Sequence, residues 1–358
     1  MSDTTVPAPT ATTAPATTAA SLEDRVRALS DTKRLALRRL IADRDAEARL
    51  LALDGSALKL LRGGPGPNLF IFPATEGSVG YMTGYLPHIP DDWSVYGCQT
   101  PGLEGEREPY TTVEDIAAHN VRQIRRVQPH GPYYLAGNCM GGLPAFETAR
   151  QLHLEGAEIG LVLHLMPTFR RQWNDLPALD SLDTRALIDY GFIIERLAGE
   201  PVRLPLDEIA RLPEDERTDK VVDFLARHPS LKGVDTAVVR HRIGVYRANL
   251  GAMFAYRPGG GFDGGLTVVA VGQDEQDEGV VDPDSPYASA INAMAEGRVR
   301  VLRVDADAST LFDCAEPHIT RVGKVLRTVL TEAGVTTRAG TGAGAEAGTK
   351  ATPPGPTA

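Results

Sequence analysis

Short apolar stretches alternate with longer amphipathic stretches over most of the chain. The apolar-rich stretches NLFIF, WSVYG, YYLAG, IGLVLHL, LTVVAVG and VRVLRVD each have the length of a buried strand. Stretches between them, such as VEDIAAHNVRQIRRV and LPAFETARQLHLEG, repeat apolar residues at helical spacing. Strands that alternate with helices predict an α/β fold, with a mostly parallel sheet and helices on both of its faces.

The chain divides into a predicted folded domain with an extension at each end. Residues 1–20 are rich in Ala, Thr and Pro, and residues 337–358 in Gly, Ala, Thr and Pro, so both are predicted to be disordered tails. Residues 21–53 predict a helical arm that packs on the domain, forms a dimer contact or docks a partner. Residues 54–336 are the predicted α/β domain. A helical stretch at about 169–256 interrupts its rhythm, and we expect it to form a lid over the site.

Composition and charge exclude several classes of function. The 358 residues include 37 Lys and Arg and 47 Asp and Glu, a net charge of −10, which is unfavourable for a general nucleic-acid or anionic-membrane binder. No run of 18 apolar residues occurs, so no membrane span is predicted. Three cysteines are too few for a disulfide framework, and the N-terminus lacks the basic and apolar segments of a secretory signal. We therefore expect a cytoplasmic protein, and we expect neither a cofactor nor a metal.

The strongest chemical signal is the sequence GNCMGG at residues 137–142, between a predicted strand and a predicted helix. This is the pattern of a nucleophile elbow, with Cys139 where such elbows carry serine. The nucleophile occupies a strained turn, so the residues two positions away must be small. The helix N-terminus favours the thiolate form of Cys139, and the Met140 amide is placed to stabilise an oxyanion. The alternative is a buried cysteine in an ordinary turn; Cys98 and Cys314 are interpreted as core or near-core thiols.

A family resemblance supports the elbow. The stretch VYGCQTPGLEGEREPYTTVEDIAAHNVRQIRRVQPHGPYYLAGNCMGGLPAFETARQL closely resembles the thioesterase domains that end nonribosomal peptide synthetases and polyketide synthases. FIFPATEGSVGYM resembles their first strand and oxyanion loop, which implies that Ala74 and Thr75 help to stabilise an oxyanion. The resemblance covers about residues 60–335, including VYRANLGAMFAYRP in the insertion. It implies an α/β-hydrolase fold and, as substrates, acyl chains on the phosphopantetheine arm of a carrier protein.

The resemblance does not supply the two residues that activate the nucleophile in this family. The family's acid follows the next strand, about 27 residues after the nucleophile, and this chain has Met166 there. The family's histidine precedes the last helix, and this chain has Ala308 at the matching place in VDADASTLFDCAEPHI. Cys139 is therefore expected to act without the family's acid and base.

Other titratable side chains are candidates to replace the missing pair. His164 lies two residues before Met166, so both point to the same face of a strand; the alternative is a buried histidine that hydrogen-bonds the backbone. His318 begins the last helix, where a surface role is the alternative. The acidic candidates are Asp274 and Glu275, which are also typical of a solvated loop, and Asp305 and Asp307, which border Ala308 and are placed to bind a substrate amine.

The missing base leads to a specific hypothesis about function. Cysteine is partly ionised at neutral pH and nucleophilic without help, and exchange of one thioester for another is close to isoenergetic. Hydrolysis is different, because a positioned base typically contributes about 10²–10⁴-fold to activation of water. We therefore predict an enzyme of natural-product biosynthesis that takes an acyl or peptidyl chain from a carrier-protein thioester onto Cys139 and passes it to a non-water nucleophile.

Two alternatives and one expectation about partners accompany this hypothesis. The first alternative is a type II thioesterase that hydrolyses stalled carrier-bound chains, with a base such as His164. The second is an inactive family member that binds a carrier protein as a scaffold. The sequence shows no carrier or adenylation region, so we expect the carrier to be a separate protein and the acyl chain to be a small molecule attached to it.

Overall fold

The computed structural model describes most of the predicted domain. The described residues are 58–165, 182–198, 202–228, 235–260, 265–272, 299–306 and 317–345. The predicted N-terminal tail at 1–20 and helical arm at 21–53 lie outside them, as do residues 346–358 of the predicted C-terminal tail. Those parts of the domain organisation stay predictions.

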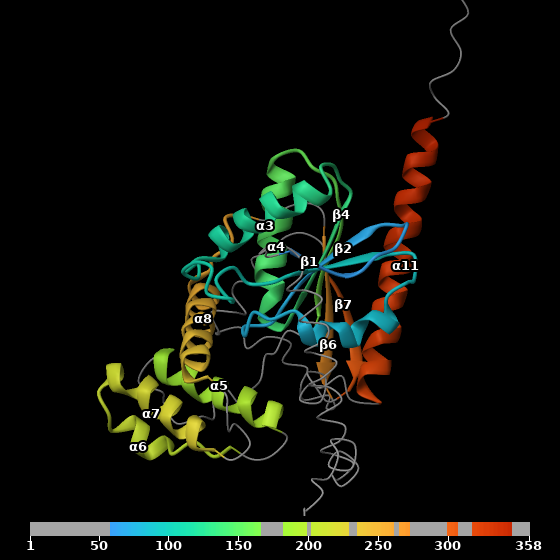
Figure 1. Ribbon diagram of the computed structural model, residues 1–358. Coiled ribbons are helices and arrows are strands. Elements are labelled where there is room, and N and C mark those ends of the chain that lie inside the picture. The colour runs from blue at the N-terminus through green and yellow to red at the C-terminus, as the bar shows by residue number, and fades with distance from the viewer. Residues whose placement is uncertain are drawn as a thin grey trace, which may run out of the picture.

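A seven-stranded sheet forms the centre of the molecule (Figure 1). Its order is β1-β3-β2-β4-β5-β6-β7; β1 is antiparallel to β3, and every other neighbouring pair is parallel. The edge strand β1 is missed by the sequence pattern, because LKLLR is short and has no β-branched residue. The other six strands coincide with the predicted apolar stretches. The strands are β1 (Leu58–Arg62), β2 (Asn68–Phe72), β3 (Ser94–Cys98), β4 (Tyr133–Asn138), β5 (Ile159–Leu165), β6 (Leu266–Gly272) and β7 (Val299–Asp305).

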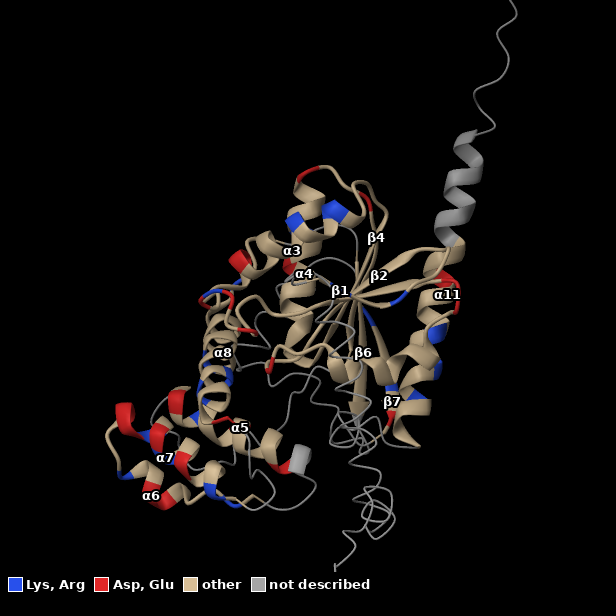
Figure 2. Ribbon diagram, viewed as in Figure 1, with Lys and Arg blue, Asp and Glu red and all other residues tan. Residues whose placement is uncertain are grey.

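Helices cover both faces of the sheet, which confirms the predicted α/β fold with a mostly parallel sheet. α3 (Val113–Val127) and α4 (Gly142–Leu154) lie on one face, and α11 (His318–Ala345) lies on the other with the 3-10 segment η1 (Gly80–His88) (Figure 1). Strands β2 to β6 contain no Lys, Arg, Asp or Glu, and the charged residues gather on the helices and connecting segments (Figure 2). This distribution is expected for a sheet buried on both faces. None of the described helices has an apolar run long enough to cross a membrane.

Most described residues of the insertion between β5 and β6 are helical. α8 packs against α5 and α7, and it also contacts α3 beside the sheet. Asp235 caps α8 by accepting a hydrogen bond from the Ala237 amide at 2.8 Å. Residues 166–181 lie outside the described residues, so the lid role of the insertion stays a prediction. The helices are α5 (Leu182–Ala198), α6 (Leu206–Ala210), α7 (Glu214–Arg227) and α8 (Thr236–Ala255).

A buried carboxylate joins α4 to the end of α8. Glu147 is fully buried, and it accepts hydrogen bonds from Arg150 Nε at 2.7 Å, Gln151 Nε2 at 2.9 Å and the Tyr256 hydroxyl at 2.7 Å. Burial raises the pKa of Glu147, but these hydrogen bonds outweigh burial and hold the pKa below its ordinary value. The insertion is thereby fixed to the helix that follows the predicted elbow.

The last helix extends beyond the predicted end of the domain. The sequence predicts a disordered tail from residue 337, but α11 continues to Ala345. No proline occurs between residues 318 and 352, so nothing in the chain blocks the helix. Propagation adds one hydrogen bond per residue once the first turns are formed, and Val322, Leu326 and Leu330 anchor those turns in the core. The helix α11 is therefore described as far as Ala345, and the predicted domain boundary at 336 stays a prediction.

Candidate functional site

Cys139 occupies a sharp turn at the carboxyl end of a central strand. β4 ends at Asn138, a single 3-10 turn spans Cys139–Gly141, and α4 begins at Gly142. Cys139 has a φ of 53°, and among the described residues it alone has a positive φ without being glycine. A side chain is rarely held in the left-handed region, and such strain gathers at functional sites. The turn has the geometry that a nucleophile elbow requires.

Three glycines around this turn are required by close contacts. A Cβ atom on Gly137 would lie 2.2 Å from the carbonyl oxygen of Gly141, and one on Gly141 would lie 2.2 Å from the carbonyl oxygen of Pro73. A Cβ atom on Gly142 would lie 2.2 Å from the ring of His164. The close contact at Gly137 lies within the turn itself. The contact at Gly141 brings the turn against the loop after β2, and the contact at Gly142 packs it against β5. Any larger residue at one of these three positions would therefore clash with a neighbouring segment, and that segment differs for each glycine.

The loop after β2 carries the predicted oxyanion residues Ala74 and Thr75, which are both buried. The Ala74 amide donates to the hydroxyl oxygen of Tyr81 at 3.0 Å, and Asn138 Nδ2 donates to the same oxygen at 2.8 Å. Burial, and then the nearby Glu76 carboxylate, raise the pKa of Tyr81 well above its ordinary value, so the phenol stays protonated. Tyr81 thus joins this loop to the elbow. Because the Ala74 amide is already used, the Thr75 amide is the better oxyanion candidate.

Sequence reasoning did not identify Tyr81, Asn138 or Asn249 as residues of the site. Asn249 lies on α8, is 1 % exposed and donates from Nδ2 to the carbonyl oxygen of Thr75 at 2.8 Å. The two residues are 174 positions apart, so no local spacing rule connects them. The signal that could have identified Asn138 and Asn249 is their polarity, because both lie in otherwise apolar, buried parts of β4 and α8.

His164 supports the backbone of the elbow. Its side chain is fully buried, and its Nε2 lies 2.5 Å from the carbonyl oxygen of Cys139. Burial lowers the pKa of His164 to about 4, although the hydrogen bond to the Cys139 carbonyl opposes the shift. The imidazole is therefore neutral at pH 7, and its Nε2–H donates to the carbonyl oxygen. This contact agrees with the backbone-bonded alternative for His164.

The pKa of His164 predicts a stability change with pH. An unfolded histidine titrates near pH 6.5 and the folded His164 near 4, so between these values the unfolded state binds more protons and the folded state loses stability as pH falls. The loss is on the order of 3 kcal/mol by pH 4, at about 1.4 kcal/mol for each pH unit. We expect His164→Gln to flatten this part of the pH dependence in urea unfolding, and replacement of the exposed His130 by glutamine is the matched control. An equal slope in His164→Gln and the natural protein would contradict the assignment.

The insertion brings further polar side chains to the Cys139 side of the sheet. Tyr246 of α8 donates to Asp189 Oδ2 of α5 at 3.4 Å, and Arg185 Nε donates to both Asp189 oxygens at 3.0 Å. Burial raises the pKa of Asp189 to about 6. Burial, then Asp189, then Cys139 raise the pKa of Tyr246 well above its ordinary value. Cys139 is 6 % exposed and belongs to the same buried cluster as Tyr246.

The remaining candidates lie elsewhere or outside the described residues. Asp305 ends β7, where its backbone carbonyl and its carboxylate accept hydrogen bonds from Arg321 at 2.7 and 3.3 Å. His318 begins α11 and is half-buried. Among the described residues, no group of three or more His, Cys, Asp or Glu is arranged to hold a metal ion. The positions outside the described residues, whose roles stay predictions, are Met166, Ala308, Asp274, Glu275, Asp307 and Cys314.

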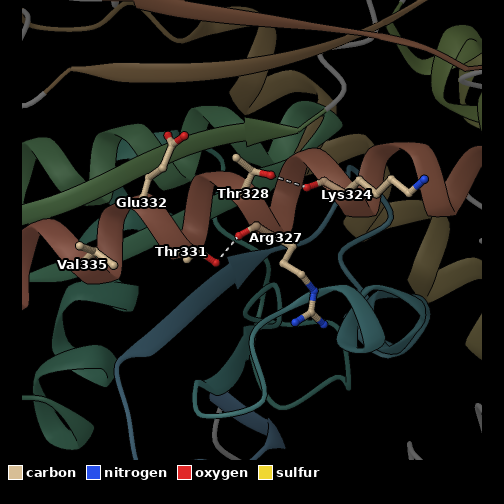
Figure 3. A pocket seen from close by; sticks show the side chains of 6 residues that line it. All are labelled: Lys324, Arg327, Thr328, Thr331, Glu332 and Val335. Atoms are coloured by element: carbon tan, nitrogen blue, oxygen red, sulfur yellow. Dashed lines mark hydrogen bonds between the residues drawn. The ribbon is translucent and has the colours of Figure 1, made fainter.

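A surface hollow along α11 is separate from Cys139. Its volume is about 710 Å³. Arg327 in its wall donates to the carbonyl oxygen of Pro87 in η1 at 2.7 Å. The lining belongs to one helix on the face of the sheet opposite α4, so the hollow is not part of the Cys139 site. The lining residues are Lys324, Arg327, Thr328, Thr331, Glu332 and Val335 (Figure 3).

Comparisons with known proteins connect this geometry with a family. Residues 67–217 match the thioesterase domain family. The chain is 28 % identical over 287 residues to the dimodular nonribosomal peptide synthase of Bacillus subtilis, a match that covers 77 % of this chain and 11 % of that protein. It is 44 % identical over 89 residues to the bikaverin polyketide synthase of Gibberella fujikuroi, which covers 25 % of this chain and 4 % of that protein. The chain thus spans a small part of the length of these curated relatives.

Solved structures share the fold. A four-domain nonribosomal peptide synthetase bound to AMP and glycine superimposes with a TM-score of 0.61 at 22 % identity, over 76 % of this chain and 20 % of that chain. The Vlm2 thioesterase domain bound with a dodecadepsipeptide superimposes with a TM-score of 0.52 at 21 % identity, over 76 % of this chain and 97 % of that chain. At these identities the likeness establishes the fold alone.

Proposed function

We propose that this chain contains a thioesterase domain of the type found in nonribosomal peptide and polyketide synthases, built on the α/β-hydrolase fold, and that Cys139 is its nucleophile. Cys139 accepts an acyl or peptidyl chain from the phosphopantetheine thioester of a carrier protein. It then passes the chain to a nucleophile other than water, in an acyl transfer or a cyclising release. The observation that carries the proposal is the strained turn of Cys139, which holds a thiol at the head of α4.

In the first step the Cys139 thiolate attacks the carbonyl carbon of the carrier thioester. A carbon–sulfur bond forms to Cys139, and the negative charge moves to the carbonyl oxygen, where the amides of Met140 and Thr75 stabilise it. The carbon–sulfur bond to phosphopantetheine then breaks, and the departing thiolate takes up the proton that Cys139 gave up. Because one thioester replaces another, this step is close to isoenergetic and does not require a strong base.

In the second step a nucleophile such as an amine attacks the acyl group on Cys139. A carbon–nitrogen bond forms, the carbon–sulfur bond to Cys139 breaks, and the proton released by nitrogen returns to sulfur. Water needs a base far more than an amine does, and such a base contributes about 10²–10⁴-fold. Met166 and Ala308 carry no titratable group at the positions where the family resemblance expects acid and base. Water is therefore a slow acceptor in this proposal.

The relatives support a carrier-bound chain as the donor. Their names describe nonribosomal peptide and polyketide synthases, and the Vlm2 thioesterase domain was solved with a dodecadepsipeptide. In this proposal the thioesterase-like domain of this protein likewise receives an acyl or peptidyl group as a thioester.

Intact mass spectrometry tests the proposal. The protein is incubated with an acylated carrier protein, and in parallel with an acyl-N-acetylcysteamine thioester. We expect a mass increase equal to the acyl group, localised to Cys139 by peptide mapping. Rapid hydrolysis without a trapped adduct would favour the type II thioesterase, and absence of both adduct and thiol release would favour the inactive carrier-binding scaffold.

A further inference from the structure

Asn249 of α8 packs directly on the loop that carries the oxyanion candidate. It is 1 % exposed, and its Nδ2 donates to the carbonyl oxygen of Thr75 at 2.8 Å. A Cβ atom built on Gly77 in the same loop would lie 3.4 Å from this Nδ2. The side-chain amide of Asn249 therefore lies against the turn from Thr75 to Gly77.

The other end of the same amide is unsatisfied. Asn249 Oδ1 is buried, and it has no hydrogen-bond partner within the described part of the chain. Chemistry fixes which amide atom is which, because the Thr75 carbonyl oxygen only accepts and the NH₂ group must face it. A buried acceptor without a donor is costly, so native proteins rarely retain one without a reason.

The same face of α8 packs into the core cluster that contains Cys139. Tyr246 precedes Asn249 by three residues, so the two side chains share one face of the helix. Tyr246 and Cys139 are both buried, and they belong to the same core cluster. Both residues of α8 thus lie on the side of the helix that packs on the oxyanion loop and into this cluster.

We propose that Asn249 Oδ1 is a specificity-determining acceptor, which binds an N–H group of the acyl chain beside the carbonyl that Cys139 attacks. This inference rests on the proposed function and adds a substrate class to it, namely aminoacyl or peptidyl chains. Their nitrogen is one carbon away from the thioester carbonyl, so a carbonyl oxygen held at the Thr75 amide brings that N–H close to the loop and to Asn249. A chain with carbon at this position leaves Oδ1 without a donor.

A pair of matched thioesters tests this inference. The first is N-acetylalanyl-N-acetylcysteamine, and the second has CH₂ in place of the N–H, as the 2-methyl-4-oxopentanoyl thioester. The rate of acyl-adduct formation on Cys139 is followed by intact mass for both. One neutral hydrogen bond leads us to expect acylation about threefold to tenfold faster with the N–H substrate. In Asn249→Leu the ratio of the two rates is expected to fall to about one, because the variant keeps the volume but has no acceptor.

The ratio of the two rates separates recognition of the substrate N–H by Asn249 from the structural contact of Asn249 with Thr75. Loss of the contact to Thr75 slows both substrates equally, so it changes the rates and not their ratio. Arg247→Ala is the matched control, because Arg247 holds α8 to Thr218 and Asp183 in the insertion and the variant keeps the Asn249 amide; it should retain the natural ratio. Asn249→Ser serves as the second variant if Asn249→Leu fails to fold.

The outcomes distinguish the inference from the proposal beneath it. A ratio of about one in the natural protein overturns the Asn249 inference while Cys139 acylation still stands. A ratio that survives in Asn249→Leu or Asn249→Ser overturns it as well. If neither substrate acylates Cys139, the proposed function itself fails. If neither variant folds, the ratio of the two acylation rates in the natural protein still tests the inference. The inference requires that ratio to exceed about three.

Discussion

We expect replacement of Cys139 by alanine to slow first-turnover thiol release from an acyl thioester by at least about 10³-fold, and to abolish the acyl adduct on the protein. The sulfur is the atom that forms the new bond, and no other group in the elbow can take its place. The main chain at Cys139 has a φ of 53°, which alanine tolerates no worse than cysteine, so the fold is expected to survive. The measurement is release of N-acetylcysteamine together with intact mass.

Cys139→Ser makes the prediction more specific. A serine hydroxyl requires an adjacent base, whereas a cysteine thiol does not, so the serine variant is expected to lose nearly as much activity as the alanine variant. The matched control is Cys98→Ala, because Cys98 is 2 % exposed in β3 and burial raises the pKa of its thiol well above the ordinary value. It should keep the adduct. A serine variant as active as the natural protein would show that a base serves position 139.

The second large effect is a gain of hydrolysis. Met166→Asp combined with Ala308→His restores an acid and a base at the two positions that the family resemblance identifies. We expect the double variant to hydrolyse an acyl thioester about 10²-fold faster than the natural protein, because water activation is the missing part. Each single variant should gain little, since a histidine without its carboxylate is poorly oriented and a carboxylate without its histidine has no proton to manage. The measurement is thiol release at steady state for all four proteins.

Two results would contradict this reasoning in different ways. A natural protein that already hydrolyses as fast as the double variant has a native base elsewhere. A folded double variant that gains nothing would show that Met166 and Ala308 do not occupy the positions of acid and base. Circular dichroism and thermal unfolding of the double variant are the necessary control, because a buried aspartate without hydrogen-bond partners lowers stability.

The sequence predicts the parts of this molecule that depend on local pattern. Six strands and the helices α3 and α4 follow from short apolar runs and from helical spacing, because burial on both faces leaves a clear signature. The turn at Cys139 follows from its glycines, since no other residue fits the contacts at Gly137 and Gly141. The length of α11 is not evident from the sequence, because Gly and Thr in its last turns are poor helix formers. The helix continues through them because its first turns are anchored in the core.

The support of the site depends on contacts between distant residues, which no spacing reveals. Tyr81 accepts hydrogen bonds from both the loop after β2 and the elbow, and Asn249 reaches that loop from α8. His164 is a candidate base in the sequence because it shares a strand face with Met166, but in the structure its Nε2 donates to the carbonyl oxygen of Cys139. The direction of a side chain at a buried position is set by its neighbours in three dimensions, and these are known only from the fold.

The central claim is that Cys139 holds an acyl chain and that water removes it slowly. The direct measurement is the decay of the isolated acyl-Cys139 adduct in buffer at pH 7, followed by intact mass, beside the same acyl group on free N-acetylcysteamine. We predict that the adduct decays within about tenfold of the free thioester, since no base activates water, and that an added amine accelerates its loss with formation of the amide. Decay of the adduct in buffer alone at about 10²-fold or more above the free thioester would contradict the claim and identify the protein as a hydrolase.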